Sequence, residues 1–240
     1  MQADLCLFEL ALQAWPSIWL FDLLRYLVPA GMVVGLLALL PARWRANRSV
    51  QSRTPADGQR RREFLNSLLT VLIFSANGAL IFAGAKAGVM RLYTDIDERG
   101  WSYAGFSLIV LVLAHDTWFY WTHRLLHRRW LFRWSHLTHH RSIAPTPWAA
   151  YSFAPAEAVL QAVFLTLILW VLPMPRAWLA GWWGRWQTTT LHHDLHHSEG
   201  RHNYGLYFTW WDRWCRTEDA EYLREGDARF GAAMQPRSAS

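Results

Sequence analysis

The sequence predicts an all-α integral membrane protein with about three full spans, a short re-entrant helical hairpin and a histidine-rich cytoplasmic cap. Three observations lead to this fold class. Apolar residues make up 52% of the 240-residue chain and form several runs as long as a bilayer core requires. Arginines gather in two of the connections between these runs. All 11 histidines fall into two short clusters, at residues 115–140 and 192–202.

Each predicted span is a run of roughly 20 apolar residues, the length that crosses a bilayer as a helix. The runs are residues 18–40, 64–85 and 103–121, and the third leads directly into the first histidine cluster. A fourth run, at residues 154–172, is closed by prolines, and the apolar residues after them are too few to cross back. We therefore expect residues 154–186 to form a re-entrant or tilted hairpin that stops short of the far side.

The arginines set the predicted orientation, because short connections rich in Arg and Lys stay in the cytoplasm. Residues 41–63 carry seven arginines, and residues 124–141 carry five. The first histidine cluster therefore lies at the cytoplasmic face, in what we expect to be a bacterial cytoplasmic membrane. Since the basic residues flank apolar spans, the net charge of +6 does not indicate nucleic-acid binding. No basic region or A-x-A site marks the first run as a cleaved signal peptide.

The histidines are spaced as on helices, where side chains three and four residues apart share a face. Eight of them form three such sets. The candidate metal-ligating and catalytic residues are the pair His123 and His127, the set His136, His139 and His140, and the set His193, His196 and His197. Neutral imidazole is a good ligand for iron, zinc, copper and nickel. One metal takes about four to six ligands, so eight histidines favour two metal ions over one.

Other polar residues near these sets are candidates for orienting the ligands, because a metal-bound imidazole usually donates its second N–H to a carboxylate or carbonyl. These candidates are His115, Asp116, Glu157, His192, Asp194 and Asp212. For Asp212, a helix cap or an arginine pair is an equally good interpretation. His115 lies about 12 Å from His123 along a helix, so packing or a hydrogen bond is favoured over metal ligation.

The histidine sets resemble those of the fatty acid hydroxylase and sterol desaturase superfamily. The matching segments read His123-Arg-Leu-Leu-His127, His136-Leu-Thr-His139-His140 and His193-Asp-Leu-His196-His197, followed by Asn203-Tyr204-Gly205 and Trp211-Asp212-Arg213. The resemblance covers residues 101–222. It implies an all-helical membrane enzyme whose histidines hold two iron ions at the cytoplasmic face. It also implies hydroxylation or desaturation of a fatty acyl chain or sterol with dioxygen. Zinc accepts the same ligands and is expected in some purified samples.

Cleavage of an unactivated C–H bond needs an oxidant and two electrons, which protein side chains do not supply. The sequence has no CxxC and no GxGxxG after a strand pattern, so we expect an external donor of ferredoxin, rubredoxin or cytochrome type. The arginine-rich face would steer an acidic donor. We divide the chain into N-terminal membrane helices with an Arg-rich loop (1–100), a catalytic domain (101–222) and a disordered tail (223–240).

Two alternatives stay open. No histidine lies between residues 142 and 191, where the resembling proteins usually carry a further histidine motif and a second apolar helix. A shortened, catalytically inactive member that binds metal is therefore one alternative. The other is a histidine-rich membrane metal transporter, which would spread its ligands through the membrane depth instead of gathering them at helix ends.

Overall fold

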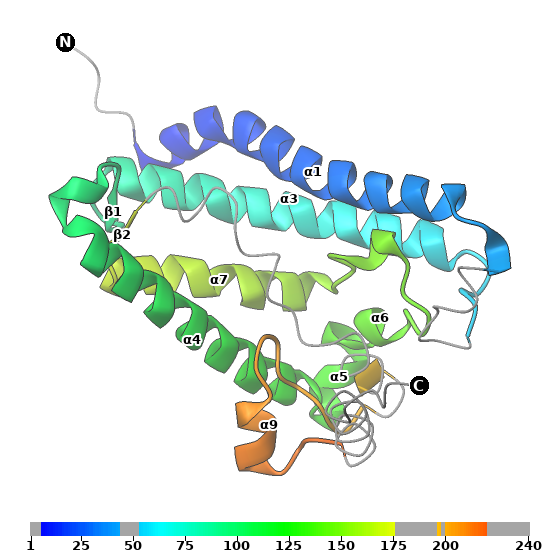
Figure 1. The fold of residues 1–240 in the computed structure, drawn as a ribbon. Helices are drawn as coiled ribbons and strands as arrows, with labels where there is room; N and C mark the ends of the chain where they lie inside the picture. The colour runs from blue at the N-terminus through cyan, green and yellow to red at the C-terminus, as the bar shows by residue number, and fades with distance from the viewer. Residues whose placement is uncertain (1–5, 44–52, 176–195, 198–199, 220–240) are drawn as a thin grey trace, which may run out of the picture.

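The computed structural model describes residues 6–43, 53–175, 196–197 and 200–219. Four helices dominate this part of the chain (Figure 1). They are α1 (Leu7–Leu39), α3 (Gln59–Lys86), α4 (Gly100–Leu126) and α7 (Pro155–Val171). The first three are long and apolar enough to cross a membrane. The predicted helical class and its three candidate spans are thus confirmed.

Short elements connect these helices or follow them. They are η1 (Ile96–Glu98), α5 (Arg129–Ser135), α6 (Leu137–His140), η2 (Pro147–Ala149) and α9 (Trp210–Cys215). Two very short strands, β1 (Leu92–Tyr93) and β2 (Met174–Pro175), pair in parallel. Figure 1 places this strand pair at one end of the bundle, and α5, α6 and α9 toward the other end.

Helix α1 runs alongside α3 and begins earlier than the apolar pattern suggested, at Leu7 instead of near residue 18. The two helices meet in a cluster that buries Tyr26, Ala30 and Val71. The outer face of α1 exposes large apolar side chains, including Leu24 and Leu36, which are half exposed or more. An apolar face of this extent is stable against lipid and unfavourable in water.

The central core joins α3, α4 and α7 through Ile81, Leu111, Phe164 and Leu169, with Met174 of β2 packed against them. All of these side chains are at least nine-tenths buried. The core fixes α4 against α7, so the residues that follow α4 and those that precede α7 come together at one end of the bundle.

Helix α7 differs from the predicted hairpin in its first arm. The Arg91 N–H donates to the Leu169 carbonyl (2.9 Å), and the Met174 N–H donates to the Arg91 carbonyl (2.9 Å). The arm therefore reaches the strand-pair end of the bundle, and the prediction that it stops short is wrong. Its 17 helical residues span about 25 Å, and the extended residues after them add about 3 Å each. The second arm, residues 176–186, lies outside the described residues.

Two buried polar residues at the start of α3 hold the connection between α6 and α7. The Gln59 amide donates to the Ala144 carbonyl (2.8 Å) and to the Glu63 carboxylate (2.7 Å). The Glu63 carboxylate also accepts from the Thr146 hydroxyl (2.5 Å). Both Gln59 and Glu63 are completely buried, so the hydrogen bonds offset the cost of taking them out of water. The N-terminal helices thus help to position the second histidine set.

Candidate metal centre

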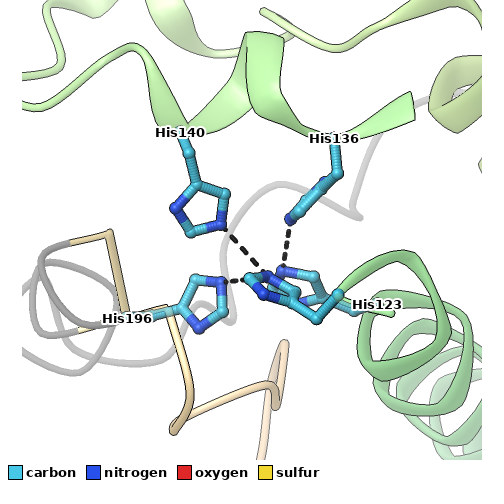
Figure 2. A group of neighbouring side chains, drawn as sticks. His123, His136, His140 and His196 are labelled. Carbon is cyan, nitrogen blue, oxygen red and sulfur yellow. Dashed lines mark hydrogen bonds between the residues drawn. The ribbon is translucent and has the colours of Figure 1, made fainter. Parts of the chain in front are cut away.

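Five histidines point toward one another at the end of the bundle formed by α4 and α6. They are His123, His127, His136, His140 and His196, and one ligand nitrogen from each lies within 4.8 Å of all the others. Figure 2 shows four of these rings turned inward from three separate segments. His123 belongs to the last turn of α4, and His127 caps that helix. The other rings come from the α6 region and from the segment containing His196.

The Nε2 atoms are the nitrogens that converge. His123 Nε2 lies 2.9 Å from His136 Nε2. His127 Nε2 lies 3.1 Å from the Nε2 atoms of both His140 and His196. A neutral imidazole carries only one N–H, so His127 can satisfy at most one of its two neighbours by donation.

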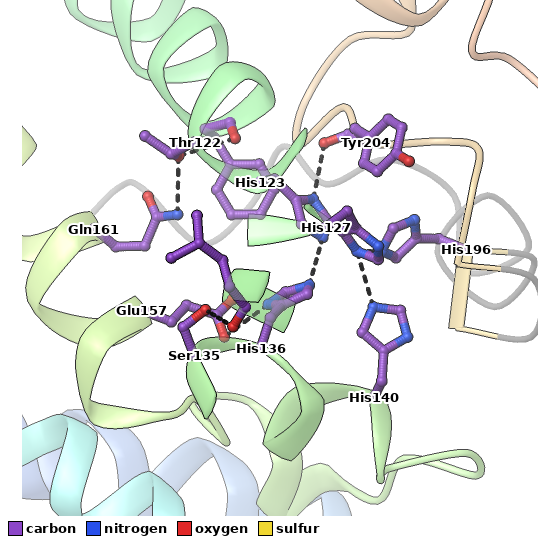
Figure 3. Close-up of polar contacts among 12 residues, drawn as sticks. Thr122, His123, His127, Ser135, His136, His140, Glu157, Gln161, His196 and Tyr204 are labelled. Atoms are coloured by element: carbon purple, nitrogen blue, oxygen red, sulfur yellow. Dashed lines mark hydrogen bonds and ion pairs between the residues drawn. The ribbon is translucent and has the colours of Figure 1, made fainter. Parts of the chain in front are cut away.

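The opposite nitrogens of three rings contact oxygen atoms. His123 Nδ1 lies 3.1 Å from the Tyr204 carbonyl, and His196 Nδ1 lies 2.6 Å from the His202 carbonyl. His136 Nδ1 lies 2.9 Å from a carboxylate oxygen of Glu157. Figure 3 shows two of these partners, Tyr204 and Glu157, on the outer sides of the cluster. A carbonyl only accepts, so His123 and His196 donate from Nδ1, and their neutral rings leave Nε2 without a proton.

The bare Nε2 atoms of His123 and His196 face other ring nitrogens at short distances. His123 Nε2 lies 2.9 Å from His136 Nε2, and His196 Nε2 lies 3.1 Å from His127 Nε2. A cation between these nitrogens would accept their lone pairs. Two ligands at right angles around an ion with bonds of about 2.1 Å are about 3 Å apart. The donor set and its spacing therefore fit a metal ion.

Burial keeps the imidazoles of His127 and His140 uncharged. It lowers the pKa of His127 to about 3, with a further lowering from the neighbouring His140. Burial also lowers the pKa of His140 to about 4. Since only the neutral ring offers a lone pair, both residues can bind metal at neutral pH.

Two further predicted ligands lie beside the five. The rings of His139 and His197 are 4.5 Å apart, centre to centre, and the rings of His197 and His140 are 4.9 Å apart. The ring centre of His139 also lies 5.1 Å from that of His136. The rings of His139 and His197 thus extend the cluster on one side. The eighth predicted ligand, His193, lies outside the described residues, as do His192 and Asp194.

The candidate orienting residues differ in what they contact. Glu157 is 1% exposed and meets His136, as described above. Asp116 instead accepts from the Tyr207 N–H (2.7 Å), the Phe208 N–H (3.2 Å) and the Trp210 indole N–H (2.6 Å). Asp116 therefore attaches the segment that leads into α9 to the middle of α4.

Asp212 fixes the backbone that carries the Tyr204 carbonyl. Its carboxylate accepts from the N–H groups of Tyr204 (2.9 Å) and Gly205 (2.8 Å) and from the Thr217 hydroxyl (2.8 Å). Because that carbonyl contacts His123, Asp212 positions the histidine cluster indirectly, through the backbone of Tyr204. His115 lies away from the five, with Nδ1 2.9 Å from the Tyr207 hydroxyl and its ring 4.8 Å from that of Phe164.

Some contributors to the site were not identified from the sequence. The carbonyls of His202 and Tyr204 are backbone groups, and every residue has one. One residue of the sequence could have indicated this loop. Asn203 adopts a positive φ of 60°, a conformation that asparagine tolerates better than most residues. Its side chain accepts from the Asp219 N–H (2.8 Å), which closes the loop that presents both carbonyls.

An apolar groove lies between α4 and α7, with a volume of about 810 Å³. Its lining includes Val110, Trp118 and Leu125 of α4 and Phe164 and Val171 of α7. Thr122 also lines the groove, and it precedes the buried His123 directly. The groove thus extends along the two helices to the level of the histidine cluster.

Known proteins share the histidine-containing part of the chain. The fatty acid hydroxylase family model matches residues 108–184. A Delta(7)-sterol 5(6)-desaturase of Gibberella zeae is 33% identical over 177 residues, which are 65% of this chain and 55% of that protein. A Delta(7)-sterol 5(6)-desaturase of Aspergillus fumigatus is 29% identical over 195 residues, covering 64% of this chain and 61% of that protein.

A lathosterol oxidase of Rattus norvegicus is 29% identical over 175 residues, covering 63% of this chain and 58% of that protein. The chain thus matches little more than half the length of these relatives. No solved structure matches it. The family model and the relatives confirm the resemblance of the histidine-containing part of the chain to the fatty acid hydroxylase and sterol desaturase superfamily.

Proposed function

We propose that this chain is a membrane oxidoreductase that hydroxylates or desaturates a lipid with dioxygen and electrons from an external donor. One observation carries the proposal. The Nε2 atoms of His123 and His136 lie 2.9 Å apart, inside a group of five inward-pointing imidazoles whose ligand nitrogens all lie within 4.8 Å of one another. A bound cation accounts for that arrangement, and the relatives are named as sterol desaturases and sterol oxidases.

We propose two iron ions as the cofactor. Five histidines are too many for one four-coordinate site, and His139 and His197 stand beside them. His193 would complete the set of eight. Bound iron supplies the activation of dioxygen that cleavage of a C–H bond requires. Zinc in a purified sample would be compatible with the same ligands.

The residues of the chain hold and shield this centre. Carbonyl contacts at Nδ1 keep the Nε2 lone pairs of His123 and His196 directed inward. The Glu157 carboxyl group lies 2.9 Å from His136 Nδ1 and would orient that ring toward a metal ion, as carboxylate partners of metal-bound histidines do. His123, His136 and Glu157 are almost completely buried, so bulk water is excluded on this side of the centre.

The proposed substrate is a sterol-like lipid or a fatty acyl chain. The groove between α4 and α7 is apolar and is lined in part by Thr122, the residue before His123, so an apolar molecule can extend from the bilayer toward the centre. Its volume is in the range of small-molecule sites. An acidic electron donor would meet Arg128, Arg129 and Arg133, which are exposed at the same end of the molecule. We place the catalytic region at residues 101–222, as predicted, with residues 1–100 supporting it through Gln59 and Glu63.

The test of this function is an oxygen-dependent change in lipids. Cells that express the chain with a competent donor are expected to contain a membrane lipid that is heavier by one oxygen or lighter by two hydrogens. Lipid mass spectrometry under air and under nitrogen measures the change, and cells expressing His136→Ala are the control. Identical lipid profiles from protein that holds iron would favour the inactive-member alternative.

The proposed orientation places the histidine cluster at the cytoplasmic side of a bacterial membrane. In a variant without Cys6 and Cys215, a single cysteine replaces either Asp57 or Ala87, which are exposed before and after α3. An impermeant thiol reagent outside intact cells is expected to label the cysteine at 87 and to spare the one at 57. Labelling in the opposite sense would place the cluster outside the cytoplasm and exclude a cytoplasmic electron donor.

A further inference from the structure

The rings between the histidine cluster and the surface form a continuous aromatic chain. Tyr204 touches the cluster, with ring centres 5.1 Å from His127, 5.4 Å from His196 and 5.6 Å from His123. The ring centre of Tyr120 lies 6.1 Å from that of Tyr204. Trp211 and then Trp214 continue the chain outward.

The outer part of this chain is closely packed. Tyr120 and Trp211 are stacked, with 5.8 Å between ring centres and 19° between ring planes. Trp211 and Trp214 are 5.4 Å apart. Tyr120 is completely buried, whereas Trp214 is 68% exposed, so the chain leads from the protein interior to the surface.

The hydrogen bonds of Tyr120 provide a proton acceptor, which a tyrosine needs when it is oxidised. Its hydroxyl lies 2.9 Å from the Thr217 hydroxyl, which in turn donates to the Asp212 carboxylate (2.8 Å). Because the only hydroxyl proton of Thr217 goes to Asp212, Tyr120 is the donor in the first of these bonds. A phenol that loses an electron also releases its proton, and Tyr120 has an acceptor chain in place.

We propose that Tyr204, Tyr120, Trp211 and Trp214 form a protective relay that carries oxidising equivalents from the metal centre to the surface when no lipid is bound. The relay rests on the proposed oxygen-dependent function. It would spare the histidine ligands, which an unused oxidant would otherwise attack.

The proposed relay moves one electron at a time. Tyr120 gives an electron across Tyr204 to the over-oxidised centre and gives its phenolic proton through Thr217 to Asp212. Trp211 reduces the tyrosyl radical, which recovers its proton, and Trp214 reduces Trp211. A small thiol in solution then reduces Trp214. Two such turns remove two oxidising equivalents from the centre and join two thiols in one disulfide.

The test treats iron-loaded protein with hydrogen peroxide in the absence of lipid, donor and thiol. Oxidised tryptophan is then located by peptide mass spectrometry, and radicals are detected by electron paramagnetic resonance of frozen samples. Trp130 on α5 is an internal control, because it is 70% exposed and lies outside the aromatic chain. We expect oxidation at Trp214 to exceed that at Trp130 several-fold, with a tyrosyl signal whose shape changes when ring-deuterated tyrosine is incorporated.

Two comparisons make the result specific. The Tyr120→Phe variant should keep its iron, lose the tyrosyl signal and show equal oxidation at Trp214 and Trp130, with damage shifted to histidines. Zinc-loaded protein should show neither radical nor selective oxidation. Equal oxidation of the two tryptophans in the unmodified protein, or unchanged selectivity in Tyr120→Phe, would overturn the relay. A protein that takes up no iron would instead contradict the proposed function itself.

Discussion

Alanine at His136 is expected to remove most of the bound metal and all of the lipid-modifying activity. The substitution deletes an inward Nε2 and leaves the Glu157 carboxylate buried without the imidazole that it contacts at 2.9 Å. Loss of one partner of a buried polar contact typically costs about 1–3 kcal/mol of stability. Metal analysis of the detergent-solubilised protein, supplied with iron during expression, measures the effect.

Two other variants separate metal ligation from general damage. Glu157→Gln keeps an oxygen acceptor for His136 and should lower metal affinity by about 10–100-fold, as is typical when the partner of a ligand is changed. His115→Gln alters a histidine whose contacts are Tyr207 and Phe164, so its iron content should be unchanged. Equal iron loss in His115→Gln and His136→Ala would show that the cluster has no special role in holding metal.

Alanine at Gly205 is expected to destabilise the protein and release metal although Gly205 carries no functional group. A Cβ atom there would lie 2.5 Å from the Phe208 carbonyl oxygen and 2.8 Å from an Asp212 carboxylate oxygen. Neither can move freely, since the Phe208 N–H is bonded to Asp116 and the Asp212 carboxylate to Tyr204. Relief of the clash would shift the Tyr204 carbonyl away from His123. Overpacking of this kind costs about 1–3 kcal/mol.

Gly105→Ala is the matched control, because a Cβ at this position of α4 meets no atom within 4 Å. Thermal unfolding in detergent and the iron content of both variants are the measurements. We expect Gly105→Ala to behave like the unmodified protein in both. If Gly205→Ala keeps its stability and its iron, the loop that carries Tyr204 does not position the histidines.

The histidine spacing predicted the members of the cluster but not what orients them. Helical spacing groups His123 with His127 and His136 with His140, and these four rings converge in the structure. The partners at Nδ1 include two backbone carbonyls, which no residue pattern reveals. Side-chain chemistry did reveal the third partner, Glu157, because a metal-bound imidazole usually donates its second N–H to a carboxylate or carbonyl.

The apolar pattern predicted the spans but not how far each one extends. Composition located α3 and α4 well, since charged residues bound their apolar runs. It missed the first turns of α1, where Pro16 lies inside the helix. It also misjudged the reach of α7, because extended residues after a helix cover about twice the distance per residue that helical ones do. Sequence length gives distance only when the backbone conformation is known.

Asp116 joins α4 to a segment that is synthesised much later. Its carboxyl group is completely buried in α4, and its described donors belong to residues 91 to 94 positions later in the chain. During synthesis, α4 enters the membrane before any of these donors exists, and an unpaired ionisable group at that depth is unfavourable. The hydrogen bonds of Asp116 can form only after Trp210 has left the ribosome. The same late segment brings the Tyr204 carbonyl to His123, so the Nδ1 partner that orients this histidine is in place only when synthesis is nearly complete.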